Sequence, residues 1–131
     1  AWDVLEKSKN ISYEKDKRPF PEFADAMRRS KCTLSPYGMG ELCFRDFEII
    51  QFGSVMIKPD MSRVLTHPNI YIPCSLDWSD LIEKIEWVKD NPKQCKEITE
   101  NARKLMKESY SIEKLLLYWY DMVKSFKGVS V

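Results

Sequence analysis

The stretch SPYGMGELCFRDFEIIQFGSVMIKP, from Ser35 to Pro59, decides the fold because it joins a glycine loop, an apolar helix pattern and a strand pattern. Three of the four glycines of the chain fall here. The apolar residues between Leu42 and Phe52 form one broad face, and Gly53 is a natural helix terminator. The run SVMIKP then has the continuous apolar character of a strand buried on both faces. This succession predicts a parallel α/β sheet.

The segments on either side extend the pattern. Upstream, the sequence predicts a helix end at 2–8, a short strand at 11–14, a helix at 21–29 and a strand at 31–36. Downstream, it predicts a strand in NIYIPC (69–74) and three helices, of which the first is capped by Ser79, the second covers 92–110 and the third is capped by Ser111. We therefore expect an α/β fold with a parallel sheet, flanking helices and a helical C-terminus.

The composition limits the classes of function. With 131 residues, of which 44% are hydrophobic and 31% charged, the chain is expected to form one globular domain, 1–131. Its 21 basic and 20 acidic residues give a net charge of +1, so nothing global attracts nucleic acid or an anionic membrane. No apolar run approaches the length of a transmembrane segment, so none is expected.

The cysteines and the single histidine are expected to be structural. Cys32, Cys43, Cys74 and Cys95 form no CxxC pair, and only His67 is available to complete a metal site, so a zinc site is not expected. Reduced, buried thiols are the expected state of these cysteines, which favours a cytoplasmic location. His67 stands directly before a proline and is interpreted as a loop-packing residue.

The glycine loop is a candidate anion site. In an open parallel sheet, ligands bind beyond the carboxyl ends of the strands, where a loop leads into a helix. Gly38 and Gly40 can adopt backbone angles closed to other residues and admit a ligand to the main chain, while the helix N-terminus offers N–H groups. Arg45 and Glu48 share a face of the helix and suit a diphosphate and a ribose. The competing interpretation is a surface Arg–Glu pair beside a plain turn; neither a GxGxxG fingerprint nor a P-loop is present.

The segment LSPYGMGELCFRDFEIIQFGSVMIKPDM, with NIYIPC, DWSDLIEKI and NARKLM downstream, resembles the C-terminal, donor-binding domain of GT-B glycosyltransferases, nearest to the group 1-like kind. The resemblance covers about residues 20–126. It implies a Rossmann-like domain that binds a nucleotide-sugar, as a fragment of a larger two-domain enzyme. The acceptor site is then expected on an N-terminal domain of the same protein, and turnover by this chain alone is in doubt.

The resemblance also implies roles for individual residues. Glu48 matches the glutamate that holds the ribose, and Arg45 matches an arginine that faces the diphosphate. The predicted catalytic residues are Arg45 and Glu41, and the predicted donor-binding residues are Ser35, Tyr37, Gly38, Gly40, Arg45, Glu48 and Lys58. Glu41 and Glu48 are separated by six residues, one fewer than in the retaining families with two glutamates. Glu41 therefore either touches the sugar or is a helix-start residue favoured by the helix dipole.

Two of these residues have a plainer alternative. Lys58 is read as a loop residue after the strand, which either borders the ligand or is simply solvated. Tyr37 either stacks on the nucleobase or sugar, or packs on the loop.

The last helix carries one apolar stripe. It is made of Leu115, Leu116, Trp119, Met122, Val123 and Phe126. This periodicity favours a core or interdomain contact over a surface for stacking on carbohydrate or nucleic acid.

The predicted function is binding of a nucleotide-diphosphate sugar for transfer to a glycan, lipid or protein acceptor. Neither a cofactor nor a metal is expected to be required, and no nucleic acid is expected as a partner. The alternative is a non-catalytic module that binds a nucleotide or a partner on a degenerate glycosyltransferase fold.

Overall fold

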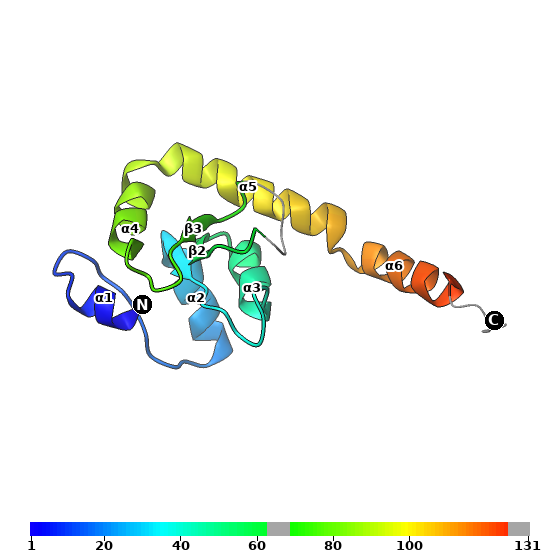
Figure 1. The fold of residues 1–131 in the computed structure, drawn as a ribbon, viewed down its shortest axis with the longest axis horizontal. Helices are drawn as coiled ribbons and strands as arrows, with labels where there is room; N and C mark the ends of the chain where they lie inside the picture. Colours follow the sequence, from blue (N-terminus) through cyan, green and yellow to red (C-terminus); the bar gives the residue numbers. More distant parts are fainter. Residues whose placement is uncertain (63–68, 126–131) are drawn as a thin grey trace.

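The computed structural model describes residues 1–62 and 69–125 (Figure 1). Within these ranges the elements are α1 (Trp2–Glu6), α2 (Phe20–Arg29), β1 (Cys32–Leu34), α3 (Phe44–Phe52), β2 (Val55–Pro59), β3 (Ile72–Cys74), α4 (Leu81–Asp90), α5 (Pro92–Ser109) and α6 (Ile112–Ser125). The α/β class, the flanking helices and the helical C-terminus are confirmed. His67 and Phe126 lie outside the described residues.

The sheet is parallel throughout, with strand order β1-β2-β3. Val55 lies opposite Cys32, and Ile57 lies opposite Ile72. All five residues of β2 are buried, as predicted for a strand covered on both faces. β3 is shorter than predicted and forms an edge of this sheet, where the exposed Pro73 can be accommodated because a proline has no N–H to donate.

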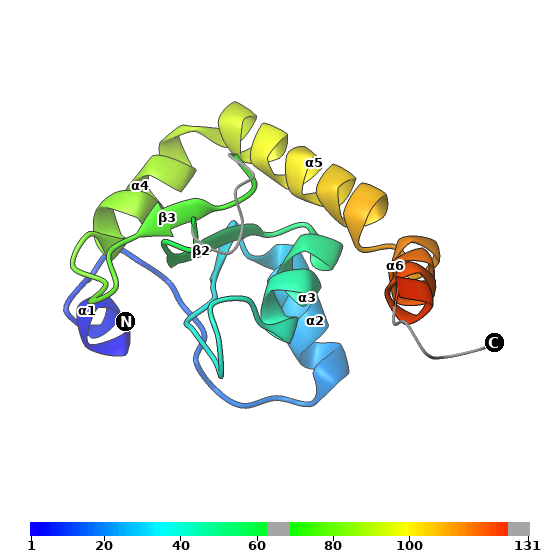
Figure 2. The ribbon, with the colours of Figure 1, turned by 45° about the vertical axis from the view of Figure 1, so that its right-hand side comes forward.

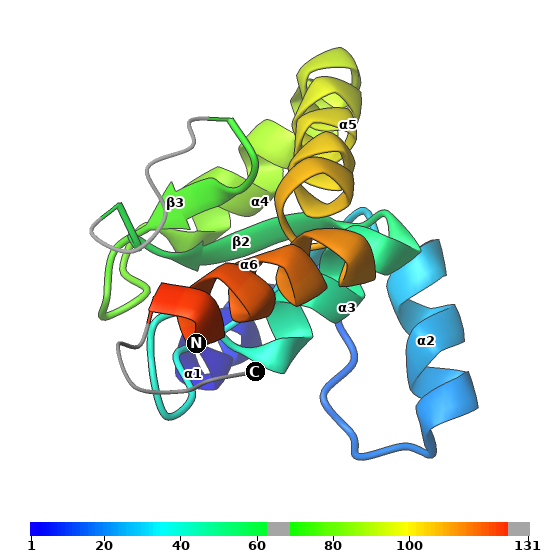
Figure 3. The same ribbon diagram turned by 90° about the vertical axis from the view of Figure 1, so that its right-hand side faces the viewer.

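Two apolar clusters lie against the sheet, and β2 contributes alternate residues to them. Val55 and Ile57 belong to the cluster with α1 and α4, whereas Met56 belongs to the cluster with α2 and α3. Successive side chains of a strand point to opposite faces, so this alternation places one cluster on each face. Figure 2 shows α1 and α4 grouped to the left of the strands and α2 and α3 below and to the right, and Figure 3 shows the sheet from another side. α5 contributes Cys95 to the first cluster and Ala102 to the second.

α3 ends where the sequence predicts. Gly53 has a φ of 80°, the left-handed conformation that closes many helices, and its N–H donates to the carbonyl of Ile49 at 3.0 Å. A Cβ at this position would overlap the guanidinium group of Arg103 from α5. The backbone conformation therefore requires glycine here, and a side chain would in addition displace the Arg103 guanidinium group.

Three local expectations are wrong. Residues 11–14 form no strand: Ile11 and Tyr13 pack on the core, but no strand of the sheet pairs with this segment. α3 begins at Phe44 rather than at 42. The N-terminal cap of α4 is Asp80, not Ser79, and its carboxylate instead accepts the N–H of Ser75 at 2.8 Å.

α6 forms as predicted, but its apolar stripe does not join the core. The hydroxyl of Ser111 accepts the N–H of Lys114 at 3.3 Å, which confirms the predicted cap. No residue of α6 is buried, and Figure 1 shows the helix extending away from the rest of the molecule. The expected core contact is therefore wrong, while an interdomain contact stays a prediction. No helix among the described residues is long and apolar enough to cross a bilayer.

The four cysteines are free. Cys74 and Cys95 are buried, whereas Cys32 and Cys43 are half-buried. Burial raises the pKa of the Cys32 thiol to about 11 and that of the Cys74 thiol to about 12.

Candidate functional site

The glycine loop, residues 35–43, leads from the end of β1 to the start of α3. Ser35 is fully buried, and its N–H donates to the carbonyl of Ile57 at 3.0 Å, which continues the β1–β2 pairing beyond β1. The loop therefore starts at the carboxyl end of the sheet, which is the edge where parallel α/β folds bind ligands.

A buried polar centre, formed by Ser35, Cys43, Asp46 and Lys58, lies at the base of this loop. The carboxylate of Asp46 accepts three hydrogen bonds: from the Ser35 hydroxyl at 2.5 Å, from the Lys58 ammonium at 3.0 Å and from the Cys43 N–H at 2.8 Å. Asp46 and Lys58 are 1% and 0% exposed, so the two opposite charges compensate each other in a place that water does not reach. These hydrogen bonds connect the end of β1, strand β2 and the first turn of α3.

The interpretation of Lys58 as a loop residue is wrong. Lys58 belongs to β2, because the strand runs on to Pro59. Its ammonium nitrogen lies 3.8 Å from the Cys43 sulfur and 5.4 Å from the centroid of the Tyr37 ring. The lysine thus contacts two residues of the glycine loop, Tyr37 and Cys43. Its direct contact with a ligand stays a prediction.

Tyr37 anchors the loop to the segment after β2. Its half-buried ring lies over Lys58, and its hydroxyl donates to the backbone carbonyl of Asp60. The Asp60 carboxylate in turn accepts the hydroxyl of Tyr71 at 3.1 Å. This geometry favours loop packing over stacking on a nucleobase for the Tyr37 ring.

The fold does not require glycine at positions 38 and 40. Of the described glycines, only Gly53 has a positive φ, so the unusual backbone angles expected for Gly38 and Gly40 are not adopted. A Cβ on Gly38 would lie 3.6 Å from the Cβ of Cys43, and one on Gly40 would lie 3.9 Å from the Leu42 carbonyl oxygen. Both are ordinary van der Waals distances, so there is room for a side chain at either position.

Arg45 and Glu48 lie on the outer side of α3. The exposed Arg45 stands in the first turn, and its guanidinium carbon lies 4.7 Å from the centroid of the Phe23 ring on α2. Glu48 follows one turn later and is half-buried. Among the described residues no ion pair joins Arg45 to Glu48, so the structure does not support the interpretation of these two as a surface salt bridge.

Glu41 is not a helix-start residue. It is half-buried and precedes the N-cap Cys43 by two positions, and the acidic residue in the first turn is Asp46. The alternative role, contact with a sugar, stays a prediction.

The structure therefore divides the predicted site into two groups. Ser35, Tyr37 and Lys58 come together around Asp46, whereas Arg45 and Glu48 lie on the outer side of the helix, with the two glycines and Glu41 in the loop between. Asp46 was missed by sequence reasoning. Its position three residues after Cys43 is the spacing of a capping box, but cysteine is an unusual N-cap, so the pattern gave a weak signal.

Phe23, whose ring lies beneath the Arg45 guanidinium group, falls within the helix predicted at 21–29 and was not singled out from the sequence. Among the described residues, no group of three or more histidine, cysteine or acidic side chains is arranged to hold a metal ion.

Residues 59–129 match the family described as glycosyl transferase family 90. This range is more than half of the 131 residues. The chain belongs to glycosyl transferase family 90. The predicted resemblance to glycosyltransferases is thereby confirmed at the level of the family, whereas the group 1-like kind and the GT-B arrangement stay predictions. The matched range begins at the end of β2, so the loop and α3 of this family 90 chain precede it.

Three relatives are similar to this family 90 chain. Uncharacterized protein 179R of Invertebrate iridescent virus 6 is 42% identical over 57 residues, which are 44% of the chain and 5% of the relative. Protein O-glucosyltransferase 3 of Homo sapiens is 27% identical over 56 residues, 43% of the chain and 11% of the relative. Uncharacterized protein 027R of Frog virus 3 (isolate Goorha) is 30% identical over 127 residues, 85% of the chain and 13% of the relative. The chain thus spans 5% to 13% of the length of these relatives.

Proposed function

We propose that the glycine loop and the N-terminus of α3 bind the diphosphate of a nucleotide-sugar, within a glycosyltransferase that transfers the sugar to a glycan, lipid or protein acceptor. The observation that carries this proposal is the pair of glycines, Gly38 and Gly40. Neither the backbone nor the packing requires them, although they lie in a loop that the buried polar centre anchors at the ligand-binding edge of the sheet. Close approach of a ligand to the main chain is a reason for glycine that the folded chain itself does not supply.

The charges around the loop suit an anion. The first turn of a helix offers N–H groups without intrahelical partners, and the helix dipole adds partial positive charge. The negative charge of Asp46 lies beneath these groups, but the ammonium group of Lys58 neutralises it. Arg45 then contributes an exposed positive charge with the forked donors that suit a phosphate.

In this proposal Arg45 and the backbone N–H groups stabilise the leaving diphosphate, with no cofactor other than the donor. Glu48 accepts hydroxyl groups of the ribose, and Glu41 contacts the sugar. The name of the human relative makes a glucosyl donor and a protein acceptor the first pair to test. The base that activates the acceptor is expected on a separate N-terminal domain, and the cytoplasmic location stays a prediction.

The test is a titration of the chain with UDP, GDP, ADP, CMP and UDP-glucose, followed by calorimetry and by the melting temperature. We expect one nucleoside diphosphate to raise the melting temperature, since a ligand at 100 times its Kd stabilises the folded state by about 2.7 kcal/mol. Arg45→Ala is expected to weaken this binding at least tenfold.

Arg28→Ala is the matched control. Its guanidinium carbon also lies over a phenylalanine ring, 4.6 Å from the centroid of Phe52, but Arg28 stands in the last turn of α2. Both variants lose one cation–π contact. If both weaken nucleotide binding equally, the loss comes from destabilisation of the fold, and the proposed site is contradicted.

A second candidate is a partner-binding module without catalysis, and the exposed apolar surface of α6 favours it. A folded chain that binds none of the nucleotides, together with a partner that binds through α6, would support this alternative.

A further inference from the structure

Phe44, the first residue of α3, is almost fully exposed. Its exposed fraction is 89%, the highest of any aromatic residue that the structure describes. The other two phenylalanines of the helix are engaged, because the ring of Phe47 lies against Tyr110 and that of Phe52 lies against Phe20. Within the described part of the chain, no aromatic ring contacts Phe44, and neither apolar cluster includes it. Packing of these residues therefore does not explain a phenylalanine at this position.

Phe44 lies on the same outer side of α3 as two residues of the predicted site. Around the helix axis, Glu48 lies about 40° from Phe44, and Arg45 lies about 100° from it in the same direction. The buried Asp46 lies about 160° from Phe44, toward the core. The first two turns of the helix therefore present three different chemical groups to the outside within one narrow arc.

The order of these groups matches the order of groups in a nucleoside diphosphate. Glu48 lies between Phe44 and Arg45 in angle, so a carboxylate stands between an aromatic ring and a guanidinium group. In a nucleoside diphosphate the ribose stands between the base and the diphosphate. If the carboxylate accepts the ribose hydroxyls and Arg45 contacts the diphosphate, the base extends toward Phe44.

We propose that the Phe44 ring stacks on the nucleobase of the donor. This inference rests on the donor site proposed above and adds to it the contact that holds the base. Stacking on an aromatic side chain suits every base, because each base has a π-face. The ligand class is therefore a nucleoside diphosphate or its sugar ester, and the ring contributes affinity for the base without selecting one base over another.

Tyr37, the aromatic residue that the sequence offered for stacking, is held by other contacts. Its ring lies over the Lys58 ammonium group, and its hydroxyl donates to the backbone carbonyl of Asp60. A base that displaced the Tyr37 ring would break both contacts. A base that stacks on the exposed Phe44 ring breaks neither of them, so stacking there costs the loop no interaction of its own.

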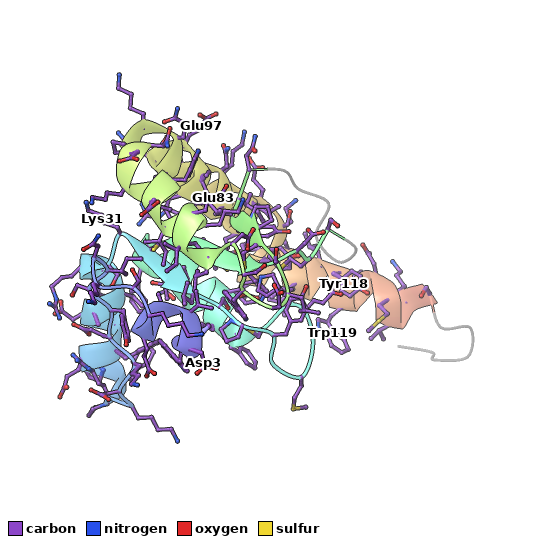
Figure 4. All side chains as sticks on the ribbon, turned by 60° about the vertical axis from the view of Figure 1, so that its left-hand side comes forward. Asp3, Lys31, Glu83, Glu97, Tyr118 and Trp119 are labelled. Carbon is purple, nitrogen blue, oxygen red and sulfur yellow. The ribbon has the colours of Figure 1, made fainter. Side chains whose placement is uncertain are left out.

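The other strongly exposed aromatic residues lie on different elements. Trp2 lies on α1, and Phe20 is the first residue of α2. Figure 4 shows Tyr118 and Trp119 on α6, the helix that extends away from the body in Figure 1. Of these residues only Phe44 directly follows the glycine loop.

The buried polar centre fixes the start of the helix that carries the ring. The N–H of Cys43, the residue before Phe44, donates to the Asp46 carboxylate at 2.8 Å, and this carboxylate also accepts the Lys58 ammonium at 3.0 Å. The backbone of Phe44 is thus placed by buried interactions, while its side chain points into solvent. Only the side-chain torsions of Phe44 have to adjust when a base binds, so little order is lost elsewhere.

The experiment is a calorimetric titration of the 131-residue chain with UDP, GDP and ADP, and with inorganic pyrophosphate as a ligand that has no base. Phe44→Ala is expected to weaken binding of the nucleotide about tenfold or more. It is expected to leave binding of pyrophosphate unchanged, because the lost contact is with the base. Arg45→Ala is expected to weaken the binding of both ligands.

Two further variants separate stacking from a plain apolar contact. Phe44→Trp keeps an aromatic face and is expected to bind the nucleotide at least as tightly as the original chain, whereas Phe44→Leu keeps only apolar surface and is expected to bind more weakly. A base that stacks on the new indole should also quench its fluorescence. The original chain, with its four tryptophans, gives the reference signal, and pyrophosphate should quench neither chain.

Phe20→Ala is the matched control. It removes another exposed phenylalanine, with an exposed fraction of 58%, from the start of a neighbouring helix. This variant is expected to leave nucleotide binding unchanged. Urea denaturation checks that Phe44→Ala and Phe20→Ala are as stable as the original chain.

The donor site and the stacking contact fail in different ways. If Arg45→Ala weakens nucleotide binding and Phe44→Ala does not, the donor site stands and the stacking contact is overturned. Equal weakening of nucleotide and pyrophosphate binding by Phe44→Ala also overturns it, because the ring then does not meet the base. An original chain that binds none of the nucleotides overturns the donor site itself, and the stacking contact with it.

Discussion

Lys58 carries a positive charge into the central strand, where its ammonium group meets one carboxylate. The pair is 0% and 1% exposed, so neither charge has access to water. The attraction between such charges is largely offset by the cost of removing them from water, but removing one partner leaves the other uncompensated. The pair therefore imposes a definite arrangement on the loop and contributes little net stability of its own.

Replacing the lysine by an apolar residue of similar length is expected to destabilise the chain strongly. In Lys58→Met the Asp46 carboxylate stays buried without its counter-charge, which lowers the free energy of unfolding by about 3–5 kcal/mol. Urea denaturation followed by circular dichroism measures this loss.

The double variant Lys58→Met with Asp46→Asn is the control. The amide carries no charge and can still accept the Cys43 N–H, so at least half of the lost stability should return. If the free energy of unfolding of Lys58→Met stays within about 1 kcal/mol of that of the original chain, the buried ion pair between Lys58 and Asp46 is contradicted.

The thiols of Cys32 and Cys74 give a second prediction. Burial raises the pKa of Cys32 from 9.0 to about 11 and that of Cys74 from 9.0 to about 12. The thiolate is the reactive form, so iodoacetamide at pH 8 should label both cysteines at least a hundredfold more slowly in the folded chain than in urea, by an order-of-magnitude estimate. Mass spectrometry of the labelled peptides gives the rate at each cysteine.

The same shifts fix the sign of the alkaline pH dependence. A thiol whose pKa is raised by folding stabilises the protein fully below the unfolded value of 9.0, and this contribution is lost as the pH rises from 9 toward 11 and 12. Cys32→Ser and Cys74→Ser are the reference variants, because each lacks one of the two thiols. If the free energy of unfolding of the original chain falls no more between pH 9 and 12 than that of these variants, the raised pKa values of the two thiols are contradicted.

At the scale of elements, α3 connects the two halves of the candidate site. Its first turn lies above the buried polar centre, and its last residue leads into Gly53 and the start of β2. The glycines at its two ends differ in kind. Gly53 is required by its left-handed backbone conformation, whereas Gly38 and Gly40 are required by neither backbone nor packing.

This contrast can be tested with matched alanine variants. Gly53→Ala forces a left-handed conformation on a residue with a Cβ and displaces Arg103, so it should lower the free energy of unfolding by about 1–2 kcal/mol or more. Gly40→Ala should change it by no more than about 0.5 kcal/mol. If the proposed donor site is correct, Gly40→Ala weakens nucleotide binding without this loss of stability.

Chemical denaturation and calorimetric titration separate the two effects. Equal destabilisation by the two substitutions would assign a structural role to the loop glycine. Unchanged binding in Gly40→Ala would contradict a close approach of the ligand at that position.

Elements with a strong local signal were predicted from the sequence, whereas contacts between distant residues were not. β2 was predicted because its continuous apolar run has few alternatives to a central strand. The segment 11–14 alternates apolar and polar residues as a half-buried strand does, but a strand needs a partner, and sequence alone does not reveal that no edge pairs with it. Lys58 was misread because a buried lysine is rare without a partner, and its partner Asp46 lies twelve positions away.

At the scale of the whole molecule, one body carries the core and α6 lies outside it. The two apolar clusters meet across β2, and α5 contributes to both, so the sheet, α1 to α4 and α5 depend on one another. None of the residues of α6 is a buried member of either cluster. The apolar stripe of α6 was correctly identified from the helical spacing of its apolar residues. This spacing predicts that one face of the helix is covered, but it does not identify the surface that covers it.

Removing α6 is therefore expected to leave the body folded. A chain that ends at Tyr110 keeps the edge-to-face contact between the rings of Tyr110 and Phe47, whose centroids are 5.4 Å apart. Within 111–125, the described part of the removed segment, no residue is buried. The free energy of unfolding of this shortened chain should lie within about 1 kcal/mol of that of the full chain, measured by urea denaturation. A chain that ends before Ala102 removes a buried residue of the second cluster and should not fold. Loss of cooperative unfolding in the first of these chains would show that α6 covers part of the core in solution, and it would contradict the extended position of α6.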